Sequence, residues 1–194
     1  MFEFHIPLKG SSFYSFRLDG SRLLFAGSRH FEVKPDIVGD LIKVFGSLGF
    51  TFMTGCASGV DESFRKALAD SKYSANTIIA CAFQKRVRDI KGLQALFVVP
   101  DGLHPSVALA KRTLWMTGRC SLLILFPSDP IGRGSALAFK SAIYNNKPVF
   151  IVSKTKPKPS SLYSVFSSNL FGIVDGFWCV PPVYKKTLLC SEAI

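Results

Sequence analysis

The residues best suited to chemistry in this 194-residue chain form the segment TGCASGVD at positions 54–61. It lies between an apolar run typical of a strand (50–53) and a helical pattern (62–69). Two glycines and two small residues let a ligand approach the backbone closely. The helix that follows offers free N–H groups and the positive end of its dipole. The segment favours a phosphate or a ribose, although a glycine turn can equally be structural.

Two further glycine-rich turns have the same setting. GSR at 27–29 follows the apolar run 22–26, and GRGS at 132–135 opens a helical pattern. An anion at these turns would meet backbone donors, two arginines and the Ser135 hydroxyl. We therefore expect all three turns to meet around one ligand.

The elements that position these turns alternate along the chain. Pro35 opens a helix that Gly49 ends, because apolar residues recur between them at steps of three and four. The segment 84–91 is basic and irregular. We expect strands at 22–26, 50–53, 76–83, 96–99, 121–126 and 149–152, the last of these being the last clear strand, and helices at 35–48, 62–69, 105–117 and 132–145.

This alternation predicts an α/β fold, a doubly wound and mostly parallel Rossmann-like sheet with short N- and C-terminal additions. Ligands of such sheets bind beyond the carboxyl ends of the strands, where the three turns lie. Residues 1–20 read as a strand or hairpin added to the core. We predict a nucleotide-binding domain at 1–153, with its core at 22–152. Residues 154–194 are predicted as a linker and an apolar segment that packs on the core or on a partner.

The composition describes a basic globular protein. Hydrophobic residues make up 48% and charged residues 19%, and 18 Phe predict an aromatic core. The net charge of +11 favours polyanions and makes their binding salt-dependent. The five cysteines are scattered without a C-x-x-C pair, so neither zinc nor a disulfide framework is indicated. Cys56, at a helix start, could have an acidic thiol.

The chain has no apolar run of the roughly 18 residues that cross a bilayer, and no secretion signal at its start. We therefore expect a cytoplasmic protein without a membrane partner. We predict no cofactor and no metal. The expected partner is a nucleotide or a single-stranded nucleic acid, and a homodimer is one option.

With the turns placed, the chain resembles the DprA/Smf-like and LOG-like Rossmann-fold proteins, the SLOG superfamily. The resemblance covers about residues 23–152. It rests on GSR at 27–29, TGxAxGVD at 54–61, Arg112 ahead of a late strand, and GxGS at 132–135 followed by KPV at 147–149.

The resemblance implies a pocket for a nucleotide, a nucleotide-derived signal or the phosphates of single-stranded DNA. In it the first turn would border base or phosphate, the second would give backbone contacts, and the third would hold phosphate. The implied binding residues are Gly27, Ser28, Arg29, Thr54, Gly55, Ala57, Ser58, Gly59, Asp61, Arg112, Gly132, Arg133, Gly134 and Ser135.

Several of these residues have structural alternatives. Asp61 either accepts from a ribose hydroxyl or caps its own helix. Arg112 either reaches the ligand or pairs with Asp61 or another acid. Arg29 and Arg133 either contact phosphate or face water.

The same motifs bear on catalysis. LOG-type phosphoribohydrolases carry a glutamate three residues after the Gly-Thr of their P-G-G-x-G-T motif, and here Ser135 stands at the Thr and Ala138 at the Glu. Alanine cannot polarise water or stabilise an oxocarbenium ion. We therefore expect no catalytic residue.

The leading function is nucleotide or single-stranded DNA binding of the DprA type, to which basic clusters at 85–88 and 154–158 would contribute. The alternatives are a LOG-like hydrolase and a nucleotide-signal sensor that acts through a partner.

Overall fold

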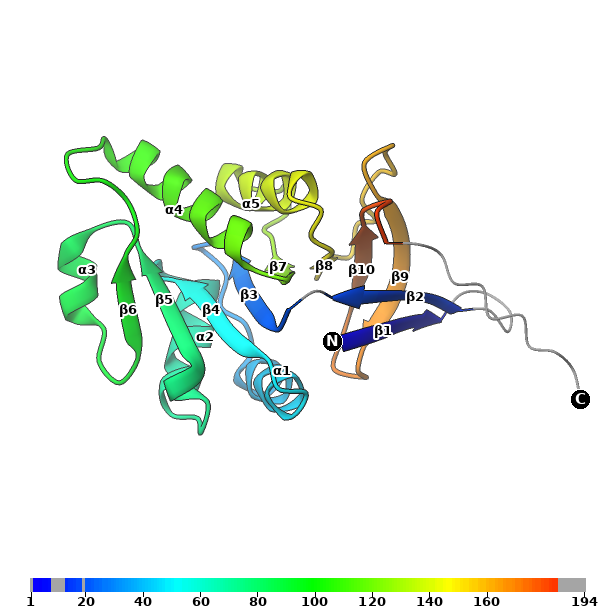
Figure 1. Cartoon of the computed structure of the whole chain (residues 1–194), viewed down its shortest axis with the longest axis horizontal. Coiled ribbons are helices and arrows are strands. Elements are labelled where there is room, and N and C mark those ends of the chain that lie inside the picture. The colour runs from blue at the N-terminus through cyan, green and yellow to red at the C-terminus, as the bar shows by residue number, and fades with distance from the viewer. Residues whose placement is uncertain (1, 8–12, 19, 185–194) are drawn as a thin grey trace, which may run out of the picture.

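The computed structural model of the chain describes residues 2–7, 13–18 and 20–184. Its centre is an eight-stranded sheet with the order β6-β5-β4-β3-β7-β8-β10-β9 (Figure 1). Its first six strands in that order run parallel. They are β3 (Arg22–Gly27), β4 (Thr51–Gly55), β5 (Thr77–Cys81), β6 (Gln94–Phe97), β7 (Leu122–Phe126) and β8 (Val149–Ile151). The predicted α/β fold with a mostly parallel sheet is confirmed.

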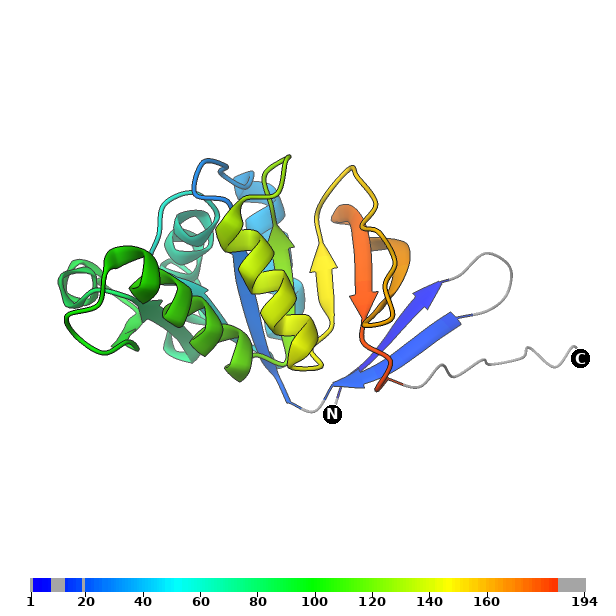
Figure 2. The ribbon, with the colours of Figure 1, turned by 90° about the horizontal axis from the view of Figure 1, so that it is seen from above.

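Helices cover both faces of this sheet. The helices are α1 (Pro35–Ser47), α2 (Val60–Ala69), α3 (Gln84–Asp89), α4 (Pro105–Arg119) and α5 (Arg133–Tyr144), with a short 3₁₀ turn η1 (Ser74–Asn76). The apolar sides of α1 and α2 pack on one face, while α4 and α5 lie on the other (Figure 2). None of the described helices has the length and apolar character needed to span a bilayer.

The core is aromatic, as the composition predicts. Phe64 of α2 stacks on Phe25 of β3 with ring centroids 3.8 Å apart. Helix α1 begins at Pro35 and is followed by Gly49, whose φ of +82° suits glycine. The start and end of this helix are thus encoded locally.

Two predictions for the chain were wrong. The segment expected to be irregular contains helix α3, whose Val87 and the following Ile90 pack against Ile79 and Cys81. Val87 is the one apolar residue among the six of this helix, which is too weak a periodic signal to reveal it.

Strand β8 is also not the last strand. An antiparallel hairpin, β9 (Ser164–Leu170) and β10 (Val174–Val180), extends the sheet through pairing of β10 with β8. The apolar segment 162–183 forms strands because it pairs with the edge of the sheet, and this edge exists only in the folded core.

The N-terminal segment forms a separate two-stranded sheet of β1 (Phe2–Pro7) and β2 (Phe13–Leu18). Its Phe4 and Phe16 rings pack on Trp178 of β10, at 5.5 and 5.2 Å between centroids. Segments from the two ends of the chain therefore lie side by side (Figure 1).

Candidate phosphate-binding site

The direction of winding reverses between β3 and β7. From β3 the chain continues to β4 on one side, whereas β7 continues to β8 on the other. The loops that leave β3 and β7 therefore lead to helices on opposite faces, α1 and α5. Neighbouring loops that diverge in this way open a crevice at the carboxyl ends of the strands.

A cavity of about 290 Å³ occupies this crevice. It is lined by the end of β3, the two loops and the first turn of α5: Gly27, Ser28, Arg29, His30, Ser128, Gly132, Arg133, Gly134 and Ser135. These include every predicted residue of the first and third turns. The predicted binding residues do not include His30, which the sequence favours as a loop residue, or Ser128; both come within three residues of the end of a strand.

The N-terminus of α5 forms one wall of the cavity. Gly132 is the N-cap and has no side chain to bond the first N–H groups of the helix. A Cβ on Gly134 would meet no atom within 4 Å, so the backbone there is open to a ligand. The side chains of Arg29 and Arg133 are exposed, and Ser135 is buried. The wall therefore combines backbone donors, a helix dipole and two cations, as an anion requires.

The 54–61 turn does not line this cavity. It packs against the β3–α1 loop, which does. Gly59 has a φ of +67°, and a Cβ there would lie 2.6 Å from the carbonyl carbon of Arg29. Val60 N–H donates to Ser28 O (3.1 Å), and Ser58 Oγ donates to Arg29 O (3.2 Å). The turn thereby fixes the backbone that carries Arg29.

Asp61 and Arg112 lie deeper, in a buried network. Asp61 Oδ2 accepts from Ala57 N–H (3.2 Å) and lies 3.5 Å from Arg112 Nη2. A Cβ on Gly55 would clash with Asp61 and lie 2.8 Å from Arg112 Nη1. The structure therefore places these residues in contact with one another, and a ligand contact by them stays a prediction. The predicted residues outside the lining are Thr54, Gly55, Ala57, Ser58, Gly59, Asp61 and Arg112.

A residue that the sequence did not reveal also holds the 54–61 turn. Arg65 of α2 donates from Nη1 to Ala57 O (3.1 Å) and Gly55 O (3.4 Å). A single arginine on a helix carries no sequence signal for such a contact. The turn is thus held by two arginines from helices on opposite faces of the sheet.

The Cys56 thiol is part of the same network. Arg112 Nη1 donates to Cys56 Sγ at 3.6 Å. A hydrogen bond from Cys81 and the Arg112 charge hold the pKa of Cys56 well below its usual value, although burial opposes them. The same hydrogen bond, together with burial, raises the pKa of Cys81. Cys56 is buried, so its thiol is not presented to solvent.

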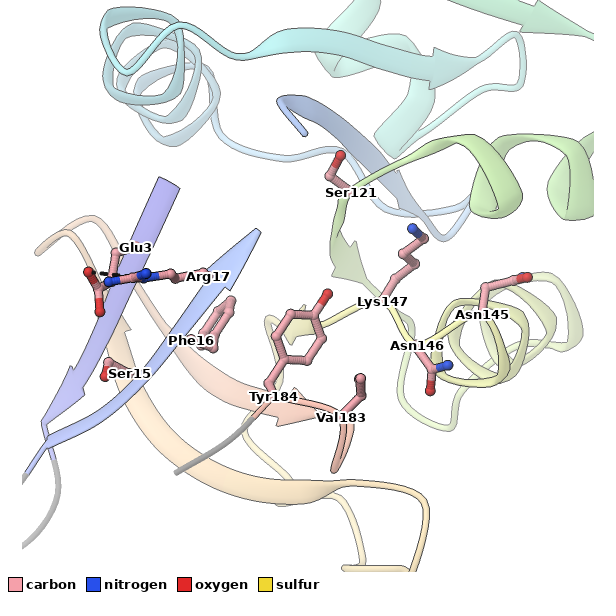
Figure 3. A pocket seen from close by; sticks show the side chains of 10 residues that line it. All are labelled: Glu3, Ser15, Phe16, Arg17, Ser121, Asn145, Asn146, Lys147, Val183 and Tyr184. Atoms are coloured by element: carbon pink, nitrogen blue, oxygen red, sulfur yellow. Dashed lines mark ion pairs between the residues drawn. The ribbon is translucent and has the colours of Figure 1, made fainter. Parts of the chain in front are cut away.

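Figure 3 shows a second pocket, of about 660 Å³, at the other end of the sheet. It lies between the β1–β2 hairpin and the turn from α5 to β8, where Arg17 forms an ion pair with Glu3 (3.6 Å) and Lys147 lies nearby. Helix α5 ends beside this pocket, and the negative end of its dipole disfavours an anion there. None of the predicted site residues lines it.

The fold has a known counterpart among solved structures. The chain is similar to the X-ray structure of DNA processing protein A (DprA) from Streptococcus pneumoniae, with a TM-score of 0.53 and 20% sequence identity. The match covers 74% of this chain and 55% of that chain, so this chain spans about half the length of the protein it matches. At this identity the similarity shows a DprA-like Rossmann fold. No family model matches the sequence, and no curated protein matches it.

Proposed function

We propose that this protein binds the phosphate of a nucleotide or of single-stranded DNA in the cavity between the β3–α1 and β7–α5 loops, without chemistry. One observation carries the proposal. The cavity lies at the switch point of the sheet and combines the N-terminus of α5 with Arg29 and Arg133. Both features favour an anion, and together they fix its position.

The lining supports binding over hydrolysis. The nine lining residues include no Asp or Glu. Ala138, at the position of the LOG-type glutamate, is 2% exposed and packs against β7 and β8 residues such as Leu125 and Val149. The small cavity therefore offers no carboxylate for the acid–base cleavage of a glycosidic bond.

Nucleic acid fits the charge of the whole chain. The net charge is +11, and the exposed residues Lys85, Arg86 and Arg88 of α3 add a basic surface at the β6 edge. The name of the similar protein, DNA processing protein A, agrees with a polyanionic ligand. Phosphate neutralisation by such residues supplies most of the affinity of non-specific DNA binding.

Titration with adenosine monophosphate and with a short single-stranded oligonucleotide tests the proposal. Charge-assisted hydrogen bonds contribute about 1.5–3 kcal/mol, so Arg29→Ala and Arg133→Ala should each weaken binding by roughly 10- to 150-fold. Arg88→Ala is the matched control: it should leave adenosine monophosphate binding unchanged. Binding measured in rising salt separates the two ligands, because the oligonucleotide affinity should fall steeply and the mononucleotide affinity little.

Two results would contradict the proposal. Failure of both ligands to bind at low salt would exclude the phosphate site. Release of free adenine from adenosine monophosphate by the purified protein would exclude binding without chemistry.

A further inference from the structure

A larger groove opens beside the phosphate cavity. Its volume is about 1390 Å³, and it shares Ser28, His30 and Ser128 with the smaller cavity. A ligand held at the N-terminus of α5 therefore has one continuous path into this groove. The groove is large enough for the rest of a nucleotide, since ligand pockets are usually about 300–1,000 Å³.

The two walls of the groove come from segments far apart in the chain. Phe31, Lys34 and Ile37, from the β3–α1 loop and the start of α1, form one wall. The β9–β10 hairpin forms the other, with Val174 and Phe177 among its residues. This second wall exists only because the hairpin extends the sheet beyond β8.

Phe31 is 46% exposed. Among the described residues Phe171 and Tyr144 are also exposed rings, but of the three only Phe31 lines the groove. A rigid aromatic ring left open at the rim of a groove offers a flat surface for a base. Val174, which packs on the same face of the sheet as α1, gives the opposite wall an apolar residue.

Charge divides the two cavities. The small cavity has Arg29 and Arg133 and no acid in its lining. The groove is lined by Lys34 and Lys154 and also by Asp129 and Asp175, so the positive and negative charges of its side chains cancel. A phosphate is favoured in the first and an uncharged nucleoside in the second.

The hairpin also supplies polar groups for the edge of a base. Asn169 Nδ2 donates to Asp175 Oδ1 at 2.9 Å, which holds both side chains across the strand pair. Asp175 Oδ2 and the Asn169 amide oxygen are acceptors, and Ser167 and Ser168 line the same groove. Such groups give orientation to a ligand whose affinity comes from stacking.

We infer that this groove holds the nucleobase and sugar of the ligand whose phosphate occupies the smaller cavity, with the base stacked on Phe31. The inference rests on the proposed function and adds the position of the base. A free nucleotide and a nucleotide within a single strand share this chemistry.

The test compares the affinities of adenosine monophosphate and ribose 5-phosphate. The native protein should bind adenosine monophosphate more tightly. Stacking contributes about 1–3 kcal/mol per base, so Phe31→Ala should weaken adenosine monophosphate binding by roughly 5- to 150-fold and leave ribose 5-phosphate binding unchanged. Phe31→Trp keeps a stacking surface and should retain the affinity. Tyr144→Ala, which removes a 72% exposed ring at the end of α5, is the control and should change neither.

The outcomes separate this inference from the proposed function. Equal native affinities for the two compounds, or an equal loss of both in Phe31→Ala, would overturn the position of the base and leave the phosphate site standing. Binding of neither compound nor of an oligonucleotide would overturn both. A short single-stranded oligonucleotide that binds much more tightly than adenosine monophosphate, and loses affinity in Phe31→Ala, identifies the strand as the source of the base.

Discussion

Asp61 and Arg112 form an ion pair inside the protein, with Asp61 Oδ2 at 3.5 Å from Arg112 Nη2 and side chains only 6% and 7% exposed. Asp61 belongs to the first turn of α2 and Arg112 to α4, which lie on opposite faces of the sheet. The pair lies beyond the end of β4, where Gly55 has no side chain that would occupy its space. It therefore joins the two helical layers at the edge of the sheet that carries the cavity.

Loss of the Asp61 charge should destabilise the fold. Asp61→Asn leaves the Arg112 guanidinium buried without its counter-ion, and breaking a buried pair in this way costs about 3–5 kcal/mol. Urea denaturation measures the change in the free energy of unfolding. Glu62→Gln is the matched control, because Glu62 pairs with Lys66 on the surface (2.8 Å) and such pairs contribute about 0–1 kcal/mol. A stable Asp61→Asn protein that had lost nucleotide binding would instead assign Asp61 to the ligand.

Two glycines of the predicted site should respond in opposite ways to alanine. In Gly55→Ala the new methyl group would clash with the Asp61 carboxylate and crowd Arg112, so we expect a loss of about 1–3 kcal/mol. In Gly134→Ala the methyl group meets open space inside the first turn of α5, so stability should stay equal or rise by up to about 1 kcal/mol. Thermal denaturation of both variants measures the difference. Equal losses in the two variants would contradict this account of the 54–61 turn.

The two ends of the chain should unfold together with the core. Trp178 is 2% exposed and packs on Phe4, Phe16 and Phe150 at 5.1–5.5 Å between ring centroids. Trp178→Ala should cost about 3–5 kcal/mol. A double-mutant cycle with Phe4→Ala should give a coupling energy of about 0.5 kcal/mol or more, because the rings are in contact. Additive losses, or a separate unfolding step for the hairpins, would show that the ends are independent of the core.

The combined contribution of the buried thiols to stability should be greatest in mildly alkaline solution. The pKa of Cys56 is lowered by the Cys81 hydrogen bond and the Arg112 charge. The native state therefore binds fewer protons there than the unfolded chain. Its contribution is complete above the ordinary thiol pKa of about 8.5 and declines as the pH falls towards the lowered value. Cys56→Ser should flatten this acid side in urea denaturation series at several pH values.

The alkaline side has the opposite sign. Burial raises the pKa of Cys120 and of Cys179 to about 12. The native state keeps these protons while the unfolded chain loses them, so stability declines as the pH rises above about 8.5. Cys120→Ala should make this decline shallower and leave the acid side unchanged. A variant with the same alkaline slope as the native protein would contradict the assignment.

The sequence by itself determined the parallel core and the local shape of its turns. Apolar runs that alternate with helical periods indicate strands covered by helices on both faces. Pro35 and Gly49 mark the limits of α1, because their backbone preferences do not depend on the rest of the chain. The turns at 27–29 and 132–135 could likewise be found, because small residues between a strand and a helix are a local feature. The hairpin β9–β10 could not, because its strands depend on an edge supplied by β8.

Only the tertiary structure decided which turns meet. The three turns look alike in sequence, yet the cavity lies between those after β3 and β7. The strand order places the reversal of winding there, so one loop turns towards α1 and the other towards α5 and a crevice opens. The turn after β4 leads to α2, on the same face as α1, and its Gly59 packs against the β3–α1 loop. The order of strands in a sheet depends on contacts between distant residues, so the local sequence of a turn cannot reveal it.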